Sequence, residues 1–422
     1  FRFLLRTLIK TFQPSYLMEF DVIVVGGGPA GASAAYFNAI EGRKVLLIEK
    51  AQFPRDKICG DGVTGKSLGI LNEMGLADEI SKIKKISCHE VILSSPNKTM
   101  LTIPIADPDD PLTAFCIERE IFDELLYQKA VSMVLEHGGQ ILNEKVSKPL
   151  IENDEIVGVI AGKAEYRSPL IVGADGFNGP IARYVMDTTK QPKQDRKHYS
   201  SAVREYWEGI TDNQGQIEIH FIDGILPGYF WIFPISENKF NIGLGMLLSD
   251  MDNQDIKLKE MLDWVIKSSF LSPRFLKATK IDGTRKGWML PMGSPRDLDL
   301  NPRKNFVPNC ILIGDAASLI DPFTGEGIGN ALVSGKLTAK YPIINDETGV
   351  QYQKELWSMI GKELTNSHRL QKMLKRKRLM NFFFKKASRK PALQDILTDM
   401  LHNKDSQTVF KSKWFWIKAL LF

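Results

Sequence analysis

The apolar residues between Phe20 and Lys50 follow a pattern that predicts a strand, a tight turn, a helix and a second strand. Asp21–Val25 is a short, nearly continuous apolar run, which is typical of buried parallel strands. Ala32–Ile40 contains small and apolar residues that can pack closely on a sheet, and Lys44–Glu49 is a second apolar run. Together these pieces have the length of a βαβ unit.

Further along the chain, the apolar pattern predicts more strands than helices before about residue 320 and mostly helix after it. The predicted elements are a helix over Phe122–His137, strands at Glu155–Ala161 and Tyr166–Asp175, a strand-rich block at 195–250, a strand within Asn309–Ser318, a helix from about Gly327 to Lys340, and a basic helical region from Glu355 onward. The turn residues Asp223-Gly224 and Glu237-Asn238 divide the strand-rich block. This order predicts an α/β fold that is interrupted by a β-rich part.

The run PGYFWIFP, Pro227 to Pro234, is apolar on both faces of a strand. Tyr229, Trp231 and Phe233 would point to one side, and Phe230 and Ile232 to the other. Such a strand should be deeply buried. The pattern leaves two interpretations open: an ordinary protein core, or a wall against a large apolar ligand.

The turn after the first strand is rich in glycine and carries the first candidate chemistry. Gly26 permits a tight turn, Gly28 lets the backbone approach a pyrophosphate, and Gly31 lets the helix pack on the sheet. The helix N-terminus offers N–H donors to the phosphates. Glu49 ends the second strand, where a carboxylate can accept hydrogen bonds from a ribose 2′-hydroxyl. The motif predicts FAD or NAD, and the acid disfavours NADP.

A second motif, Ile311–Leu332, favours FAD over NAD. Asp315 ends a strand, as expected for a group that binds the ribityl chain. The loop Thr324–Gly327 then places backbone N–H groups and a helix N-terminus where the reduced flavin is negatively charged. Two further pieces are Asp175-Gly176 after a strand and Arg119 ahead of the second helix.

In this order, the motifs resemble those of FAD-dependent oxidoreductases of the p-hydroxybenzoate hydroxylase type. Within that group the chain resembles the geranylgeranyl reductase family, through Lys57–Gly62 (KICGDG) and the YxWxFP pattern of Tyr229–Pro234. The resemblance extends from about Met18 to Pro342. One departure is Phe177-Asn178-Gly179, where relatives often have a serine.

The resemblance implies a set of site residues. Those expected to bind FAD are Gly26, Gly28, Ala30, Gly31, Glu49, Lys50, Cys59, Gly60, Arg119, Asp175, Gly314, Asp315, Gly325, Gly327 and Ile328. The YxWxFP strand would face an isoprenoid chain through Tyr229, Trp231, Phe233 and Pro234. Tyr229, Trp231 and Cys59 are the candidate catalytic residues, although Cys59 as a packing residue is an equal alternative.

The implied activity is the saturation of isoprenoid carbon–carbon double bonds on a lipid, quinone or polyprenyl precursor. An isolated alkene accepts hydride poorly, so protonation to a tertiary cation should precede hydride transfer from N5 of the reduced flavin. Ordered water or a pocket hydroxyl such as Tyr229 would deliver the proton. The alternatives are an FAD monooxygenase or halogenase, and a non-enzymatic electron-transfer flavoprotein. NAD(P)H and ferredoxin both remain possible electron donors.

The expected fold is a Rossmann-like FAD-binding domain, an antiparallel β-sheet substrate domain and a helical C-terminal segment. The expected ranges are 18–85, 115–185 and 285–345 for the first, 86–114 and 186–284 for the second, and 346–422 for the third. Residues 1–17 would be a non-native extension ahead of Met18, or a membrane-surface helix.

Charge is distributed unevenly along the 422 residues. The net charge is +5, yet Arg369–Lys390 holds ten Lys/Arg and no Asp/Glu. Such clustering disfavours a nucleic-acid enzyme. Together with the terminal Trp414–Phe422, it favours the surface of an anionic membrane over a plain solvated helix. The four cysteines lack metal-ligand spacing, so we expect no structural metal and a cytoplasmic protein, peripheral to the inner face of the membrane.

Overall fold

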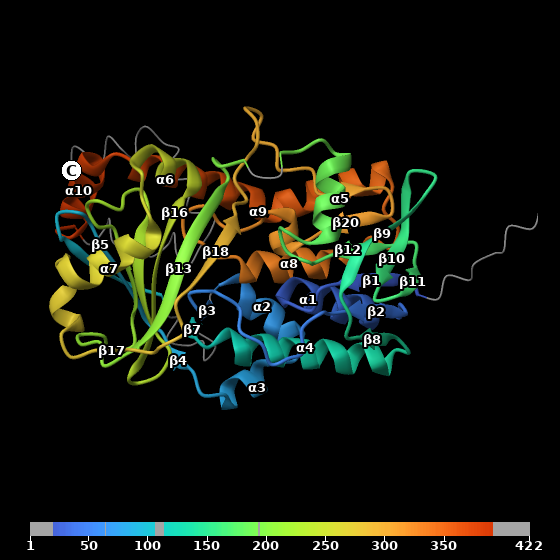
Figure 1. Cartoon of the computed structure of the whole chain (residues 1–422), viewed down its shortest axis with the longest axis horizontal. Helices are drawn as coiled ribbons and strands as arrows, with labels where there is room; N and C mark the ends of the chain where they lie inside the picture. The colour runs from blue at the N-terminus through green and yellow to red at the C-terminus, as the bar shows by residue number, and fades with distance from the viewer. Residues whose placement is uncertain (1–19, 64, 106–113, 193–194, 391–422) are drawn as a thin grey trace, which may run out of the picture.

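Two large β-sheets, one mostly parallel and one mostly antiparallel, lie next to each other along the long axis of the molecule (Figure 1). The computed structural model describes residues 20–63, 65–105, 114–192 and 195–390. The expectations for residues 1–17 and for Trp414–Phe422 lie outside these ranges.

The first sheet has six strands in the order β19-β20-β12-β1-β2-β8. Its strands are β1 (Val22–Val25), β2 (Val45–Ile48), β8 (Gln140–Leu142), β12 (Ile171–Gly173), β19 (Phe306–Val307) and β20 (Cys310–Leu312). All pairs except β19–β20 are parallel. The residues of β1 and β2 are all buried, as expected for strands that helices cover on both faces.

Helices pack around this sheet: α1 (Pro29–Ile40), α4 (Arg119–Glu136), α5 (Pro180–Thr188) and α8 (Ile328–Thr338). Helix α1 contacts both α4 and α8. Small residues allow α1 and α8 to approach closely, because a Cβ at Gly335 would lie 2.4 Å from the carbonyl oxygen of Ala30. The Ser33 hydroxyl also donates across this interface to the carbonyl of Leu332, at 2.7 Å.

The second sheet has eight strands, in the order β17-β13-β16-β15-β14-β5-β6, with β18 also paired to β13. They are β5 (Glu90–Ser94), β6 (Met100–Pro104), β13 (Tyr199–Glu208), β14 (Ile217–His220), β15 (Tyr229–Pro234), β16 (Lys239–Leu247), β17 (Thr279–Lys280) and β18 (Lys286–Pro291). The pairing is antiparallel apart from β14–β5. One face packs against α7 (Leu258–Ser268), with α6 (Leu248–Gln254) and the 3₁₀ helix η1 (Ser272–Phe275) nearby.

Smaller elements complete the fold. They are a sheet of β9 (Val146–Glu152), β10 (Glu155–Ala161) and β11 (Ala164–Arg167), a sheet of β3 (Gly62–Val63), β7 (Phe115–Cys116) and β4 (Ile86–Ser87), and the helices α2 (Lys66–Glu73), α3 (Ala77–Lys82), η2 (Gly314–Ala317), α9 (Asp346–Leu374) and α10 (Lys377–Ala387). Within the described part of the chain, no helix is both long and apolar enough to cross a bilayer.

The predicted fold class is confirmed: a Rossmann-like parallel sheet with helices is combined with antiparallel sheets. Some details differ. The strand predicted at Tyr166–Asp175 is divided between β11 and β12, with Pro169 in the gap. Helix α9 begins at Asp346, earlier than the predicted Glu355, behind a capping box of Asn345 and Thr348. Helices α6 and α7 were not predicted.

The domain boundaries expected from the sequence stay a proposal. Strand β18 lies within the range 285–345, which was expected to belong to the FAD-binding domain, but it pairs with β13 in the eight-stranded sheet. The chain therefore passes between the two sheets close to Pro291, just before it returns to the six-stranded sheet at β19.

Candidate active site

A cavity of about 1360 Å³ extends from the carboxyl ends of β1 and β2 to the open face of the eight-stranded sheet. Most of the predicted site residues line it: Gly26, Gly28, Ala30, Glu49, Lys50, Cys59, Gly60, Arg119, Asp175, Tyr229, Trp231, Phe233, Asp315, Gly325, Gly327 and Ile328. Gly31, Gly314 and Pro234 are buried and are not part of its lining. One cavity thus brings together motifs that are far apart in the sequence.

The glycines at the start of α1 form the first part of the nucleotide end. Gly26 has a φ of +105°, and a Cβ there would lie 2.4 Å from the carbonyl oxygen of Ala174. A Cβ at Gly31 would lie only 1.7 Å from the carbonyl oxygen of Gly26, so Gly31 acts in packing. No side chain caps the N-terminus of α1, which leaves its N–H groups available to an anion in the cavity.

Glu49 supplies a fixed carboxylate beside this turn. Its Oε2 accepts a hydrogen bond from the Gly27 amide at 2.6 Å, and its Oε1 accepts one from the Ala51 amide at 2.8 Å. Each carboxylate oxygen can accept further bonds, and the residue lines the cavity. This arrangement suits the ribose hydroxyls of a dinucleotide.

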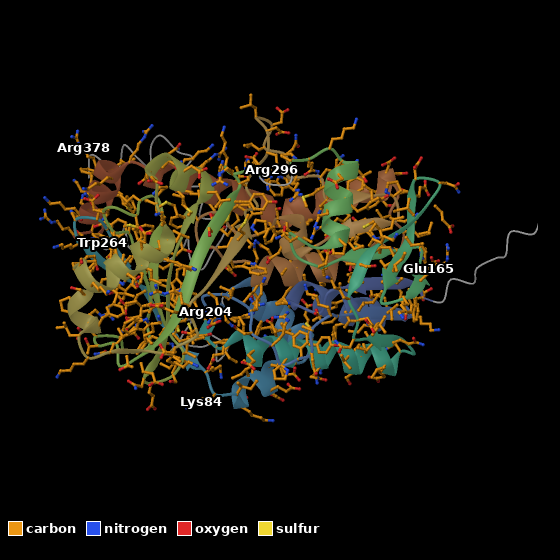
Figure 2. All side chains as sticks on the ribbon, viewed as in Figure 1. Lys84, Glu165, Arg204, Trp264, Arg296 and Arg378 are labelled. Atoms are coloured by element: carbon orange, nitrogen blue, oxygen red, sulfur yellow. The ribbon has the colours of Figure 1, made fainter. Side chains whose placement is uncertain are left out.

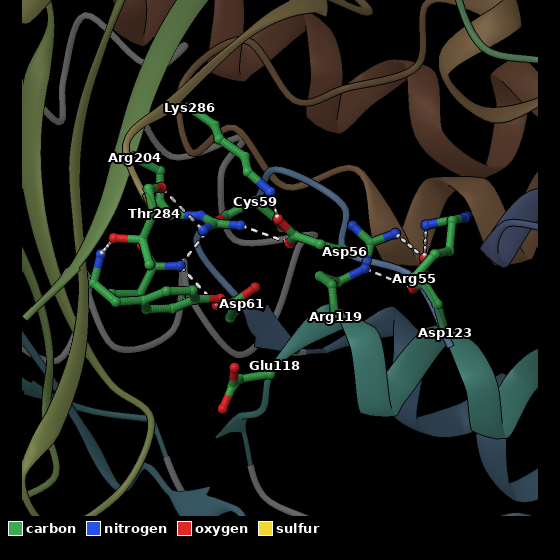
Figure 3. A network of polar contacts seen from close by, with 12 residues as sticks. Arg55, Asp56, Cys59, Asp61, Glu118, Arg119, Asp123, Arg204, Thr284 and Lys286 are labelled. Carbon is green, nitrogen blue, oxygen red and sulfur yellow. Dashed lines mark hydrogen bonds and ion pairs between the residues drawn. The ribbon is translucent and has the colours of Figure 1, made fainter. Parts of the chain in front are cut away.

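Two arginines, the predicted Arg119 and the unpredicted Arg55, converge on the buried carboxylate of Asp123 (Figure 3). Arg119 makes a bidentate pair with Asp123, with Nε–Oδ1 at 2.6 Å and Nη2–Oδ2 at 2.8 Å. Arg55 Nη1 lies 2.9 Å from Asp123 Oδ2, and the Arg55 guanidinium also approaches Gly28. Arg55 therefore places a positive charge beside the uncapped end of α1. Arg55 belongs to none of the motifs identified in the sequence, because no spacing rule selects this residue.

The second motif forms the opposite wall of the nucleotide end. Asp315 is partly exposed to the cavity, and its Oδ2 lies 3.7 Å from Lys57 Nζ. Lys57 also lies 4.1 Å from the centroid of the Trp288 ring. Burial lowers the pKa of Lys57, and Asp315 counteracts part of that effect. Gly327 and Ile328 start α8, whose N-terminus also lacks a side-chain cap.

Asp175 lines the cavity, and its carboxylate also contacts the start of α5. It accepts hydrogen bonds from the amides of Ile181 at 2.7 Å and Ala182 at 3.3 Å, at the start of α5. Burial raises the pKa of Asp175 to about 7, against the effect of these amide donors. The contacts describe Asp175 as a group that holds the helix start in place.

These features fit FAD. Two uncapped helix N-termini face the cavity, a fixed carboxylate lies at the end of β2, and a second carboxylate lies at the end of β20. Gly26–Gly31 and Glu49 would hold the ADP half, Asp315 the ribityl chain, and the loop at Gly325–Gly327 the isoalloxazine. Among the described residues, no group of three or more His, Cys, Asp or Glu side chains could hold a metal ion.

The aromatic strand β15 separates this cavity from the protein core. Tyr229, Trp231 and Phe233 line the cavity, whereas Phe230 and Ile232 lie in the core cluster that contains the apolar side chains of α7. The ring centroids of Tyr229 and Trp231 are 6.2 Å apart, and those of Trp231 and Phe233 are 6.4 Å apart. One face of the strand therefore packs in a protein core and the other lines the cavity, whereas an apolar ligand on that second face stays a prediction.

Apolar side chains from neighbouring strands extend this wall. They are Val91, Leu93, Ile105, Ile217, Ile219, Phe221, Met246, Leu247 and Leu290. The turn that carries Cys59 closes over it, because a Cβ at Gly60 would lie 2.9 Å from the Phe233 ring. Cys59 is half-buried and lines the cavity beside this contact. It is thus near both the aromatic wall and Arg119.

A buried polar network behind the wall was not predicted. Trp231 Nε1 donates to Asn241 Oδ1 at 2.9 Å, and Asn241 Nδ2 lies 2.8 Å from the Cys59 carbonyl and 2.7 Å from Asp61 Oδ2. The Tyr206 hydroxyl donates to the same Asp61 oxygen at 2.6 Å. Burial raises the pKa of Asp61 to about 6, although these two donors oppose the rise. The network ties the Cys59 turn to the aromatic strand.

Tyr229 makes a different contact. Its hydroxyl donates to the carbonyl of Thr324 at 2.6 Å, and the oxygen lies 2.9 Å from where a Cβ on Gly325 would be. Burial raises the pKa of Tyr229. The phenol therefore joins the aromatic strand to the loop at the flavin end, and it is a weaker acid than an exposed tyrosine.

A cationic strip lines the side of the cavity between its two ends. Arg204 Nη2 lies 2.7 Å from Asp56 Oδ1, and Lys286 Nζ lies 2.6 Å from Asp56 Oδ2 (Figure 3). Arg204 comes from the middle of β13, at the centre of the molecule (Figure 2), and its guanidinium lies 4.3 Å from the centroid of the Tyr206 ring. The cavity thus changes from charged to apolar along its length.

Comparison with known proteins agrees with this geometry. A family model described as an FAD binding domain matches residues 19–203, and one described as a geranylgeranyl reductase catalytic domain matches residues 198–282. A menaquinone reductase of Mycolicibacterium smegmatis is 30% identical over 76% of this chain and 75% of its own length. A digeranylgeranylglycerophospholipid reductase of Picrophilus torridus is 30% identical over 87% of both chains.

Solved structures show the same fold. A geranylgeranyl bacteriochlorophyll reductase-like protein of Thermoplasma acidophilum superimposes with a TM-score of 0.74, at 23% identity over 95% of both chains. A variant of the flavin-dependent brominase Bmp2 superimposes with a TM-score of 0.71, at 20% identity over 94% of this chain and 97% of its own. The fold is therefore shared by reductases and halogenases, whereas the catalytic-domain match and the sequence relatives separate them. This chain belongs to the geranylgeranyl reductase family of FAD-dependent oxidoreductases.

Proposed function

We propose that this protein saturates carbon–carbon double bonds in the isoprenoid chain of a lipid, a quinone or a polyprenyl precursor drawn from a membrane surface. The observation that carries the proposal is the shared cavity: Trp231 and Phe233 line the same space as Asp315 and the loop at Gly325–Gly327. An apolar chain lying on the aromatic wall would therefore reach the site that fits the flavin.

The aromatic wall would bind the chain by burial. Apolar surface removed from water contributes on the order of 25 cal/mol per Å², so several isoprene units can be held without polar contacts. Trp231 has its indole N–H engaged by Asn241, which leaves its apolar ring faces to the cavity. The wall would also shield the bound chain from bulk water.

Reduced FAD, when bound, would supply the hydride equivalent that adds to one carbon of the double bond. The other carbon needs a proton, and the chain's own residues limit its source. The Tyr229 hydroxyl already donates its hydrogen to the Thr324 carbonyl, so this proton is not directed to a chain on the aromatic wall. We therefore assign proton delivery to water, and give Tyr229 the task of holding the Thr324 loop against the strand. Single-turnover reduction by Tyr229→Phe tests this assignment, since an abolished rate with unchanged FAD affinity would return Tyr229 to the role of acid.

Anaerobic single turnover tests the proposed reaction. The FAD-loaded protein is reduced with dithionite and mixed, without oxygen, with a geranylgeranyl lipid or with menaquinone. We expect the flavin to be reoxidised and the prenyl chain of the product to gain two hydrogen atoms for each bond reduced, measured by mass spectrometry after any quinol has been reoxidised in air. Flavin that stays reduced with both substrates would contradict the proposal.

The same assay distinguishes the alternative chemistries. A monooxygenase or halogenase would consume O₂ in step with an aromatic or lipid-like substrate, the halogenase only with halide. An electron-transfer flavoprotein would show a reducible flavin and no prenyl product. NAD(P)H and reduced ferredoxin, tested in turn as the reductant in place of dithionite, would identify the electron donor.

A further inference from the structure

Helix α10 lies at the end of the molecule that is farthest from the six-stranded sheet (Figure 1). It is an eleven-residue helix that follows α9 after a two-residue connection. Its buried side chains are Met380, Phe384 and Ala387, and they cluster with Leu101 and Phe221 of the β-rich part. One face of α10 therefore covers the edge of the eight-stranded sheet.

This apolar face lies one aromatic layer away from the cavity. The ring centroids of Phe384 and Phe221 are 6.2 Å apart. Phe221 lines the cavity, where its ring centroid lies 6.2 Å from that of Tyr229 and 6.3 Å from that of Phe323. The aromatic end of the cavity is therefore separated from α10 by the packed rings of Phe221 and Phe384.

The opposite face of α10 is cationic. Arg378 and Lys385 of the helix and Arg389, two residues after its end, are exposed, and Arg378 projects from the edge of the molecule (Figure 2). Phe382 is 39% exposed among these cations, and Lys386 Nζ lies 5.9 Å from the centroid of its ring. Arg369–Lys390 contains no acidic residue, so the positive charge of this face is not balanced within the segment.

Cations around an exposed aromatic ring form the composition that binds the interface of an anionic bilayer. We infer that the cationic face of α10, with Phe382, is a docking surface for an anionic lipid bilayer, oriented so that the apolar end of the cavity under Phe221 faces the membrane. The inference rests on the proposed function for its purpose, because an isoprenoid lipid must leave the bilayer to reach the flavin. An acidic partner protein would match the cations but would have no use for the exposed ring beside the apolar end.

Vesicle binding tests the docking surface. The FAD-loaded full chain is mixed with vesicles of phosphatidylcholine alone or of phosphatidylcholine with phosphatidylglycerol, and the bound fraction is measured by sedimentation. The test variant is Arg378→Glu/Lys385→Glu/Arg389→Glu. The control, Lys148→Glu/Lys163→Glu/Lys190→Glu, makes the same charge change at exposed lysines of the FAD-binding end.

We expect the wild type to bind only the anionic vesicles. The α10 variant should bind them at least about 100-fold more weakly, since each cation at an anionic surface contributes about fivefold and the introduced glutamates add repulsion. The control should stay within about threefold of the wild type, and all three proteins should keep their FAD. Equal binding by wild type and the α10 variant, or binding of wild type to an acidic redox protein but to neither vesicle, would overturn the inference.

Turnover separates this inference from the proposed function. With a geranylgeranyl lipid in detergent micelles, the α10 variant should react like the wild type, and with the same lipid in anionic vesicles it should be at least about tenfold slower. If the wild type binds anionic vesicles as expected but does not reduce the lipid in micelles, the docking surface is supported and the reductase proposal is refuted. Equal turnover by both proteins in vesicles would refute the orientation toward the membrane.

Discussion

The two ends of the cavity are built in different ways. The nucleotide end is formed mainly by backbone: glycines at positions 26 and 31 allow contacts that no side chain could tolerate, and two helix N-termini face the cavity. At the aromatic end, side chains from strands of the eight-stranded sheet form the wall, and a buried network led by Asn241 holds them. A substitution that adds a side chain at the nucleotide end should abolish folding or FAD binding. A substitution at the aromatic end should leave the protein folded but weaken substrate binding.

The largest expected effect is at the nucleotide end. Gly31→Ala would place a Cβ 1.7 Å from the carbonyl oxygen of Gly26, and backbone atoms cannot move away cheaply. We expect loss of FAD binding and of the folded protein, measured by flavin absorbance and circular dichroism. Gly42→Ala, at the other end of the same helix, is the control. A Cβ added at Gly42 would meet no atom within 4 Å, so the only cost is the backbone strain of an alanine at a φ of +77°. We expect this strain to lower stability by about 1–2 kcal/mol.

The aromatic end should show a large effect on activity and a small one on the cofactor. Trp231→Ala removes the central ring of the wall and one bond of Asn241, which keeps its contacts to the Cys59 carbonyl and to Asp61. We expect isoprenoid turnover to fall by about 100-fold, about 2.7 kcal/mol, with FAD retained. Ile232→Val changes the core face of the same strand. It should cost about 0.5–1.5 kcal/mol of stability and leave the KM unchanged. Equal losses of turnover in both variants would mean that β15 acts only as core.

Asp61, which joins the two ends, should give the protein a pH-dependent stability. Its pKa is raised to about 6 in the folded protein, so the folded state binds more protons than the unfolded state between about pH 4 and pH 6. Stability should therefore fall by about 2–3 kcal/mol as the pH rises through this range. Urea unfolding at a series of pH values should show a flatter profile for Asp61→Asn. Asp175 also makes the free energy of unfolding depend on pH, but equally in the wild type and in Asp61→Asn. The difference between the two pH profiles therefore gives the contribution of Asp61.

The smallest effect is expected for Glu49→Gln. The substitution keeps one acceptor oxygen for the Gly27 amide but removes the charge offered to the ribose hydroxyls. We expect the Kd for FAD to rise about tenfold, about 1.4 kcal/mol, with little change in Tm of the apoprotein. Titration of the apoprotein with FAD measures it. An unchanged Kd would remove Glu49 from the nucleotide contacts.

The difference between the two ends also explains what could be predicted from the sequence. The nucleotide end is local: Gly26–Gly31 and Glu49 lie within one βαβ unit, so their spacing predicts their arrangement. The network behind the wall is not local. Asn241 meets Asp61 across 180 residues, and this depends on the β15–β16 register that pairs Phe233 with Asn241. A slip of one residue in that register would turn Asn241 to the other face, and no feature of the sequence alone fixes it.

Helix boundaries show a similar limit. The start of α9 was placed at Glu355 because the basic, amphipathic pattern is clear only from there. The capping pair of Asn345 and Thr348 was a usable signal for the earlier start. Helix α6 has only seven residues and little local pattern. Helix α7 carried a usable signal, because its buried Leu258, Leu262, Val265 and Ile266 recur at helical spacing.

The most direct test of the central claim is a crystal structure of the FAD-loaded protein soaked with a fully saturated phytanyl lipid. The claim is that one cavity holds both the isoalloxazine edge and an isoprenoid chain. We predict a chain along Tyr229, Trp231 and Phe233, in van der Waals contact with the ring at the Gly325–Gly327 loop. A chain bound elsewhere, or a side chain separating the aromatic wall from the flavin, would contradict it.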